Sequence, residues 1–365
     1  ATVGFTLVRT DGLTSAAGSE LHWRWTPTAE ERLLSLAAPT PASPAAGSTS
    51  GIPRVPEMPI WPGFRGAGRD GRVRGVRYET NWTASPPVEL WRQPVGPGWS
   101  SFAVSGDRFY TQEQRGEQET VSCYRLTNGA PVWQHQDPAR FWESNAGAGP
   151  RGTPTLHDGR VYTLGGTGIL NALDARTGAR LWSRDVTVEA QKKAPEWGFS
   201  SSPWILDDVV VVAATGTLLA YDRATGAPRW TGPADGGSYS SPQEVEIHGV
   251  KQLVLMSGVG LSSVSPRDGT VLWQHAWPGF GIVQPAQIAP GEFLLSTGDR
   301  KGSRRIEVTR EGEAWKTTER WTSLRLKAYF NDFVLHGGNA YGFDGGLLTC
   351  VDLKDGARRW KDGRY

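Results

Sequence analysis

Polar and aromatic side chains recur at one point of the sequence, each time beside a run of small polar residues. The stretches that carry them include "RFWESNAGAGPRG" (140–152), "PEWGFSS" (195–201) and "AYFNDF" (328–333). Ligand pockets typically combine aromatic walls with a few convergent polar groups. We therefore expect one pocket, with no catalytic residue assigned, formed by Trp99, Glu143, Asn145, Arg151, Trp197, Tyr239, Gln284, Asn331 and Asp332. The alternative is that these residues only hydrogen-bond the loop backbone and wall a funnel.

The elements that must position these residues are short strands, because the chain repeats itself from about residue 85 onward. Successive copies, aligned on the Trp that ends each of them, lie 39 to 49 residues apart. Four strands with their turns need about 45 residues. The aligned residues are Trp91, Trp133, Trp182, Trp230, Trp273, Trp321 and Trp360. This spacing predicts a series of four-stranded sheets.

One copy, residues 201–230, shows how such a sheet is encoded. Its runs of Val, Leu, Tyr and Trp predict strands at 202–206, 208–213, 217–221 and 227–231. Between the last two, "DRATG" is typical of a hairpin loop. We expect Asp222 to accept hydrogen bonds from nearby backbone N–H groups and Gly226 to adopt a left-handed conformation.

The ends of these copies are almost identical in two places. "ALDARTGARLW" (172–182) and "AYDRATGAPRW" (220–230) share an Asp, a Thr-Gly pair and a final Trp. The phrase resembles the tryptophan-docking motif of the pyrroloquinoline-quinone (PQQ) repeat β-propellers. The resemblance implies that each Trp stacks against the next blade. It assigns a structural docking role to the aligned tryptophans and to Asp174, Thr177, Gly178, Asp222, Thr225 and Gly226.

The resemblance to this family covers residues 85–365 and implies an all-β propeller of four-stranded blades. About six blades are expected here and eight in the intact protein, so that this fragment is an open ring, incomplete at its C-terminal end. Trp91 is expected to end an outermost strand with no blade before it. The first strand of each blade, expected to line the channel, is assigned to stretches such as "WSSF" (99–102), "SSSP" (200–203) and "YSSP" (239–242).

The first 84 residues do not repeat. Residues 1–60 are expected to be an N-terminal segment, with a short helix capped by Thr28 and Glu31 and a Pro/Ala/Ser-rich linker at 38–59. Residues 61–84 form a lead-in segment. Its "WPGFRG" resembles the lead-in of exported propellers that are related to the propeller lipoprotein of outer-membrane barrel assembly.

Composition narrows the range of functions. The chain has 39 basic and 37 acidic residues, a net charge of +2, which gives no electrostatic signature of nucleic-acid binding. Cys123 and Cys350 stand where the docking motif has Ala and are expected to be small buried residues. His135 and His275, each following "WQ", are expected in loops, and no metal site is assigned.

Three functions remain open. The leading hypothesis is a non-catalytic binding or scaffolding module on the periplasmic side of a bacterial envelope, tethered to the membrane by residues upstream and recognising a protein partner or small ligand. The first alternative is a divergent PQQ-dependent dehydrogenase that binds PQQ with calcium at the channel mouth, with Glu143 or Asp332 as base or calcium ligand. The adjacent cysteines usual in such enzymes are absent. The second alternative is a carbohydrate-binding propeller.

Overall fold

The computed structural model describes residues 7–10, 21–36, 60–233, 235–297 and 301–363, so the linker expected at 38–59 lies outside the described residues. Its contacts divide the chain into two units, of which unit 1 ends at Ser183 and unit 2 begins at Arg184. Each unit is described by itself.

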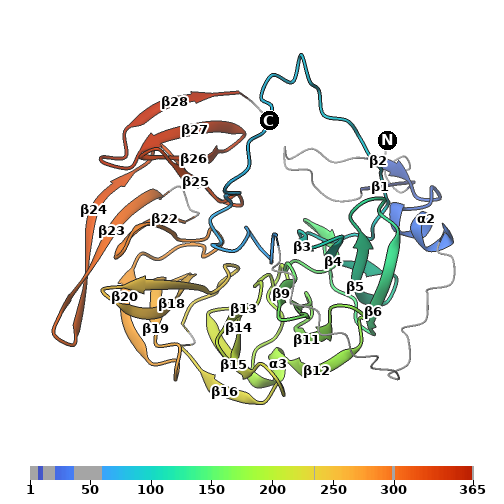
Figure 1. Cartoon of the computed structure of the whole chain (residues 1–365), viewed down its shortest axis with the longest axis horizontal. Coiled ribbons are helices and arrows are strands. Elements are labelled where there is room, and N and C mark those ends of the chain that lie inside the picture. The colour runs from blue at the N-terminus through green and yellow to red at the C-terminus, as the bar shows by residue number, and fades with distance from the viewer. Residues whose placement is uncertain (1–6, 11–20, 37–59, 234, 298–300, 364–365) are drawn as a thin grey trace. The chain divides into compact units, whose positions relative to one another are not determined.

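Six four-stranded antiparallel sheets make up most of the described chain, and each is built from four consecutive strands (Figure 1). The β-propeller fold class predicted from the repeat is therefore confirmed. The first two sheets contain β3 (Ala103–Ser105), β4 (Arg108–Arg115), β5 (Gln118–Arg125) and β6 (Pro131–Asp137), then β9 (Thr155–His157), β10 (Arg160–Leu164), β11 (Ile169–Asp174) and β12 (Arg180–Asp185).

The remaining four sheets follow the same order in unit 2. They contain β13 (Trp204–Leu206), β14 (Val209–Ala214), β15 (Thr217–Asp222) and β16 (Pro228–Thr231); β17 (Gln243–Ile247), β18 (Val250–Ser257), β19 (Gly260–Val264) and β20 (Val271–Ala276); β21 (Ala286–Ala289), β22 (Glu292–Thr297), β23 (Gly302–Glu311) and β24 (Ala314–Ser323); β25 (Val334–His336), β26 (Asn339–Asp344), β27 (Leu347–Asp352) and β28 (Arg358–Asp362).

Smaller elements complete the description. Ahead of the sheets lie β1 (Val8–Thr10), β2 (Leu21–Trp23) and the helix α2 (Ala29–Leu36). Thr28 and Glu31 exchange hydrogen bonds at the start of α2, as the sequence predicts. The two-stranded β7 (Trp142–Glu143) and β8 (Gly147–Ala148) and the four-residue helix α3 (Val186–Glu189) were not predicted from the repeat.

The core lies between neighbouring sheets. In β14 all six residues are buried, because this strand of Val and Ala is covered on both faces. Its Val211 and Ala213 pack with Leu253 and Leu255 of the next sheet. In unit 1, Tyr110 and Trp133 pack in the same way with residues of β9–β11. Within each unit, neighbouring sheets thus share a hydrophobic core.

The turns of the repeated phrase form as the sequence predicts. The Asp174 carboxylate accepts hydrogen bonds from the backbone N–H of Arg176 and of Thr177 and from the Thr177 hydroxyl. The Asp222 carboxylate does the same in the next copy, and Gly178 and Gly226 adopt φ of 75° and 72°. The Asp–Thr–Gly phrase therefore closes a hairpin.

Two strand predictions are wrong. The segment that ends at Trp91 forms no strand, because no strand among the described residues pairs with its backbone. The "WSSF", "SSSP" and "YSSP" stretches precede β3, β13 and β17 instead of forming them. In unit 2, serine side chains of these stretches accept hydrogen bonds that a neighbouring strand would otherwise accept. The Ser201 hydroxyl accepts from Ala213 N–H, and the Ser241 hydroxyl accepts from Ser202 N–H.

The histidine prediction is also wrong. His135 lies in β6 and His275 in β20, so both are strand residues and not loop residues. The reason is that β6 extends four residues past Trp133 and β20 extends three residues past Trp273. The interruption before Trp321 is likewise regular structure, since it lengthens β23 and β24 into a hairpin of ten-residue strands.

Candidate functional site

In unit 1 the candidate residue Glu143 is buried at the base of a loop between the first two sheets. Its carboxylate accepts hydrogen bonds from the backbone N–H of Asn145 at 2.7 Å and of Ala146 at 2.6 Å. Arg151 donates to the same carboxylate at 3.2 Å. The acid is therefore used to hold the turn between β7 and β8.

Arg151 is also enclosed by this loop. It donates to the carbonyls of Gly147 and Ala148, and its guanidinium lies 5.0 Å from the centre of the Phe141 ring. Burial lowers the pKa of Arg151, and the nearby carboxylates of Glu143 and Glu119 oppose that shift. A buried arginine held in this way fixes the loop as a rigid element.

Trp99 completes the unit 1 group. Its indole N–H donates to the Ala146 carbonyl at 2.9 Å, and 59% of its surface is exposed. Asn145, which precedes Ala146 on the turn that Glu143 holds, is exposed. The structure thus brings Trp99 against the loop that carries Glu143, Asn145 and Arg151, with its aromatic face toward solvent.

In unit 2 the loops before four successive sheets are joined by aromatic contacts. The ring centroids of Trp197 and Tyr239 are 5.0 Å apart, and those of Trp197 and Phe330 are 6.0 Å apart. Phe330 contacts Tyr329, which in turn contacts Phe280. We call Trp197, Tyr239, Phe280, Tyr329 and Phe330 the aromatic row. Phe280 is 42% and Phe330 66% exposed, so the row offers apolar surface to solvent.

The polar candidates of unit 2 belong to the same loops as Phe280 and Phe330 of this row. Asp332 accepts a hydrogen bond from Gln284 N–H at 2.6 Å, and the buried Gln284 side chain accepts from Ser241 N–H at 3.4 Å. Asn331 is exposed. Asp332 and Gln284 therefore tie loops together, and Asn331 is the candidate amide that faces solvent.

Sequence reasoning identified the loops but not all of their aromatic members. Phe280, Tyr329 and Phe330 lie in the stretches that the sequence singled out. Their position just before the first strand of a sheet could have identified them as members of the site. The lead-in segment was missed altogether as a structural partner. Trp61 pairs with Val104 of β3, and the Pro62 carbonyl accepts from Leu156 of β9, so this segment runs along the first strands of unit 1.

The aligned tryptophans make one recurring contact within each unit. The indole N–H donates to a backbone carbonyl at the turn of the following sheet, at 2.9 to 3.0 Å: Trp91 to Leu126, Trp133 to Ala175, Trp230 to Pro266 and Trp321 to Leu353. Trp273 instead donates to the Gln252 side chain at 2.7 Å. Trp182 is buried near Tyr162, whereas Trp360 is 42% exposed.

Cys123 and Cys350 are free and buried, as expected from the sequence. Burial raises the pKa of the Cys123 thiol to about 12. Within the described residues, no cluster of three His, Cys, Asp or Glu side chains is arranged to hold a metal ion. None of the helices described is both long and apolar enough to cross a bilayer.

Comparisons with known proteins give the chain's relatives. It is 27% identical over 235 residues to tetrathionate hydrolase of Acidithiobacillus ferrooxidans, covering 59% of this chain and 45% of that protein. It is 25% identical over 200 residues to outer membrane protein assembly factor BamB of Yersinia pestis, covering 52% and 48%. The chain thus spans about half the length of the curated relatives it matches.

Among solved structures, BamB from Moraxella catarrhalis aligns with 17% identity and a TM-score of 0.46, covering 70% of this chain and 83% of that one. A sequence family described as outer membrane protein assembly factor BamB matches residues 85–191 and 117–362. These matches span nearly all of the repeated sheets. The chain therefore belongs to the outer membrane protein assembly factor BamB family of PQQ-like propellers.

Proposed function

We propose that this protein is a non-catalytic binding module that takes a protein partner on the aromatic row of unit 2. The observation that carries the proposal is the exposure of Phe280 and Phe330 within a set of rings that contact one another. Exposed aromatic residues held in place by their neighbours are typical anchors of protein interfaces, because they bury apolar area with little loss of side-chain freedom.

The state of the carboxylates supports binding over catalysis at these loops. A general base must reach a substrate proton, and a calcium ligand must offer free oxygen atoms. Glu143 already accepts two backbone N–H groups and pairs with Arg151, and Asp332 accepts from Gln284 N–H. Both acids are thus engaged in holding loops.

We further propose that the protein works in the cell envelope. The support is its family, since the matching relatives bear the name outer membrane protein assembly factor. The mass of the crosslinked adduct identifies the partner as a membrane protein or as another envelope component.

The test is site-specific crosslinking in the native host. A photoreactive phenylalanine analogue replaces Phe330 or Phe280 in the full chain, and a control chain carries it at Leu181, an exposed position on the outermost strand β12. We expect one common adduct from both row positions, its loss when Trp197→Ala is added, and none from Leu181. Adducts that form equally from Leu181, or none from the row, would refute the proposal.

A second candidate function is supported by the similarity to a protein named tetrathionate hydrolase, an enzyme. If unit 1 or unit 2 carries an enzyme site that uses PQQ with calcium, titration of the full chain with both should give saturable quenching of tryptophan fluorescence. Binding that is lost with Arg151→Ala or Trp197→Ala would support an enzyme. Tryptophan fluorescence that falls only by as much as the absorbance of PQQ itself explains, up to about 1 mM PQQ, would exclude a PQQ-dependent enzyme.

A further inference from the structure

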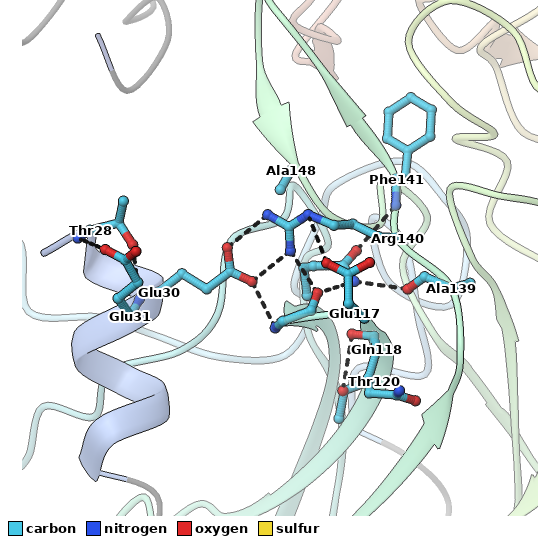
Figure 2. A network of polar contacts seen from close by, with 12 residues as sticks. Thr28, Glu30, Glu31, Glu117, Gln118, Thr120, Ala139, Arg140, Phe141 and Ala148 are labelled. Atoms are coloured by element: carbon cyan, nitrogen blue, oxygen red, sulfur yellow. Dashed lines mark hydrogen bonds and ion pairs between the residues drawn. The ribbon is translucent and has the colours of Figure 1, made fainter. Parts of the chain in front are cut away.

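The turn between β4 and β5 holds a carboxylate that comes from the N-terminal helix. Figure 2 shows Glu30 reaching from α2 toward Arg140. The two guanidinium nitrogens Nη1 and Nη2 donate to the two oxygens of Glu30, both at 2.9 Å, and Gly116 N–H donates to Oε1 at 2.8 Å. Two parallel charge-assisted hydrogen bonds with a backbone donor make a specific carboxylate site.

This site is built by the sheet and does not depend on the helix. Arg140 Nη1 also donates to the Gly116 carbonyl at 2.6 Å, and this hydrogen bond fixes the guanidinium to the β4–β5 turn. The fully buried Gln114 donates to the carbonyls of both Gly116 and Ala139 and accepts from Phe141 N–H. The arginine and the turn are therefore held in place by contacts that would remain if Glu30 left.

The helix itself buries few of its side chains. Of its eight residues only Leu33 is buried, with 6% exposed, whereas Leu36 is 73% exposed. Glu30 and Leu33 are three residues apart and so lie on one face of α2. A helix this short is marginal in water without such contacts. One ion pair and one leucine thus dominate the attachment.

We call the Arg140 guanidinium together with the Gly116 N–H the notch. We propose that the notch is a binding site for a helix of the form Glu-x-x-Leu on a partner protein, and that α2 occupies it as a built-in competitor. The partner's carboxylate accepts hydrogen bonds from Arg140 and Gly116 as Glu30 does, and its leucine takes the buried place of Leu33. A tethered occupant competes through its high effective concentration, so a partner gains the notch only when its own helix binds more strongly or α2 is released.

The experiment uses the full chain and a fluorescent peptide of residues 27–36 as the probe. In one chain, Glu30→Gln with Leu33→Ala weakens the tethered occupant and leaves the notch open. We expect the peptide to bind this chain with a Kd at least about tenfold lower than it has for the unaltered chain. Adding Arg140→Gln should abolish that gain, and a peptide with Glu30→Gln should lose most of its affinity for the opened chain.

Two controls separate the notch from general charge and from misfolding. Arg125→Gln removes an arginine of β5 that is paired with Asp107 at the surface, and it should leave peptide binding unchanged. Binding should also shift the amide resonance of Gly116 in the opened chain. The proposal is overturned if the opened chain shows no saturable binding at about 1 mM peptide, or if Arg140→Gln leaves the Kd unchanged.

Discussion

Trp133 and Ala175 join the first two sheets, because the indole N–H of the one donates to the carbonyl of the other at 3.0 Å. The Trp133 ring also covers Gly178, three residues farther along the same turn. The last strand of one sheet is thereby fixed to the hairpin of the next. The contact combines a satisfied indole donor with buried aromatic area, and both should contribute to stability.

Replacing Trp133 by alanine should therefore lower the free energy of unfolding by about 3 to 5 kcal/mol, as for other large-to-small changes in a core. Trp133 is 2% exposed, whereas Trp360 occupies the same register in the last sheet and is 42% exposed. Trp360→Ala is the matched control and should lower it by about 1 kcal/mol. Urea unfolding measures both. Equal losses would show that the contact with the next sheet contributes little.

The close approach of Trp133 to Gly178 gives a second prediction. A Cβ at Gly178 would lie 2.5 Å from the ring, whereas one at Gly159, which has a similar φ of 70°, would meet no atom within 4 Å. Gly→Ala at either site adds strain at positive φ, about 1 kcal/mol. Gly178→Ala should lose a further 1 to 3 kcal/mol, roughly, from overpacking. Thermal unfolding of the pair isolates that difference, and its absence would contradict the packing.

The fold was predictable because each copy of the repeat carries its own instructions. Asp222, Thr225 and Gly226 encode a turn through local hydrogen bonds and a positive φ, and neither depends on distant residues. The strands at 209–214 and 217–222 follow from Val and Leu runs between such turns. The same turn and strand pattern, repeated every 39 to 49 residues, therefore indicated the sheets and their number.

What the sequence could not predict depends on distant partners. Trp91 has the same type and phase as Trp133, yet whether its segment forms a strand depends on a neighbouring strand to pair with. The loops of the candidate site were located by phase alone. The direction of the Glu143 carboxylate could not be predicted, because it is set by hydrogen bonds with the backbone of Asn145 and Ala146 and with Arg151. Glu143, which the sequence placed in a candidate ligand pocket, therefore stabilises its own loop.

The engagement of Glu143 predicts a structural phenotype. Glu143→Ala leaves Arg151 buried without its carboxylate and frees two backbone N–H groups, so we expect a loss of about 3 kcal/mol in the free energy of unfolding. Trp142→Ala, at the exposed neighbour in the same short strand, should change it by less than about 1 kcal/mol. Chemical denaturation compares the two. A fully stable Glu143→Ala protein would show that the acid does not hold the loop.

Buried thiol and phenol groups predict a loss of stability in alkali. Burial raises the pKa of Cys123 to about 12 and that of Tyr124 to about 12. In the unfolded chain the thiol has a pKa of about 8.5 and the phenol a pKa of about 10. Between those values and 12 the unfolded chain loses protons that the folded chain keeps, so the free energy of unfolding should fall as the pH rises from about 8.5 toward 12.

Cys123→Ala tests the thiol's part in this loss, because Ala172 and Ala220 stand at the equivalent position of the next two sheets and show that alanine fits there. Urea midpoints at about pH 7 and about pH 10 should differ less for this variant than for the unaltered chain, since one of the groups that resists ionisation is gone. Comparing the difference between two pH values removes the packing effect of the substitution itself. Identical pH dependence in the two proteins would mean that Cys123 ionises as readily in the folded chain as in the unfolded one.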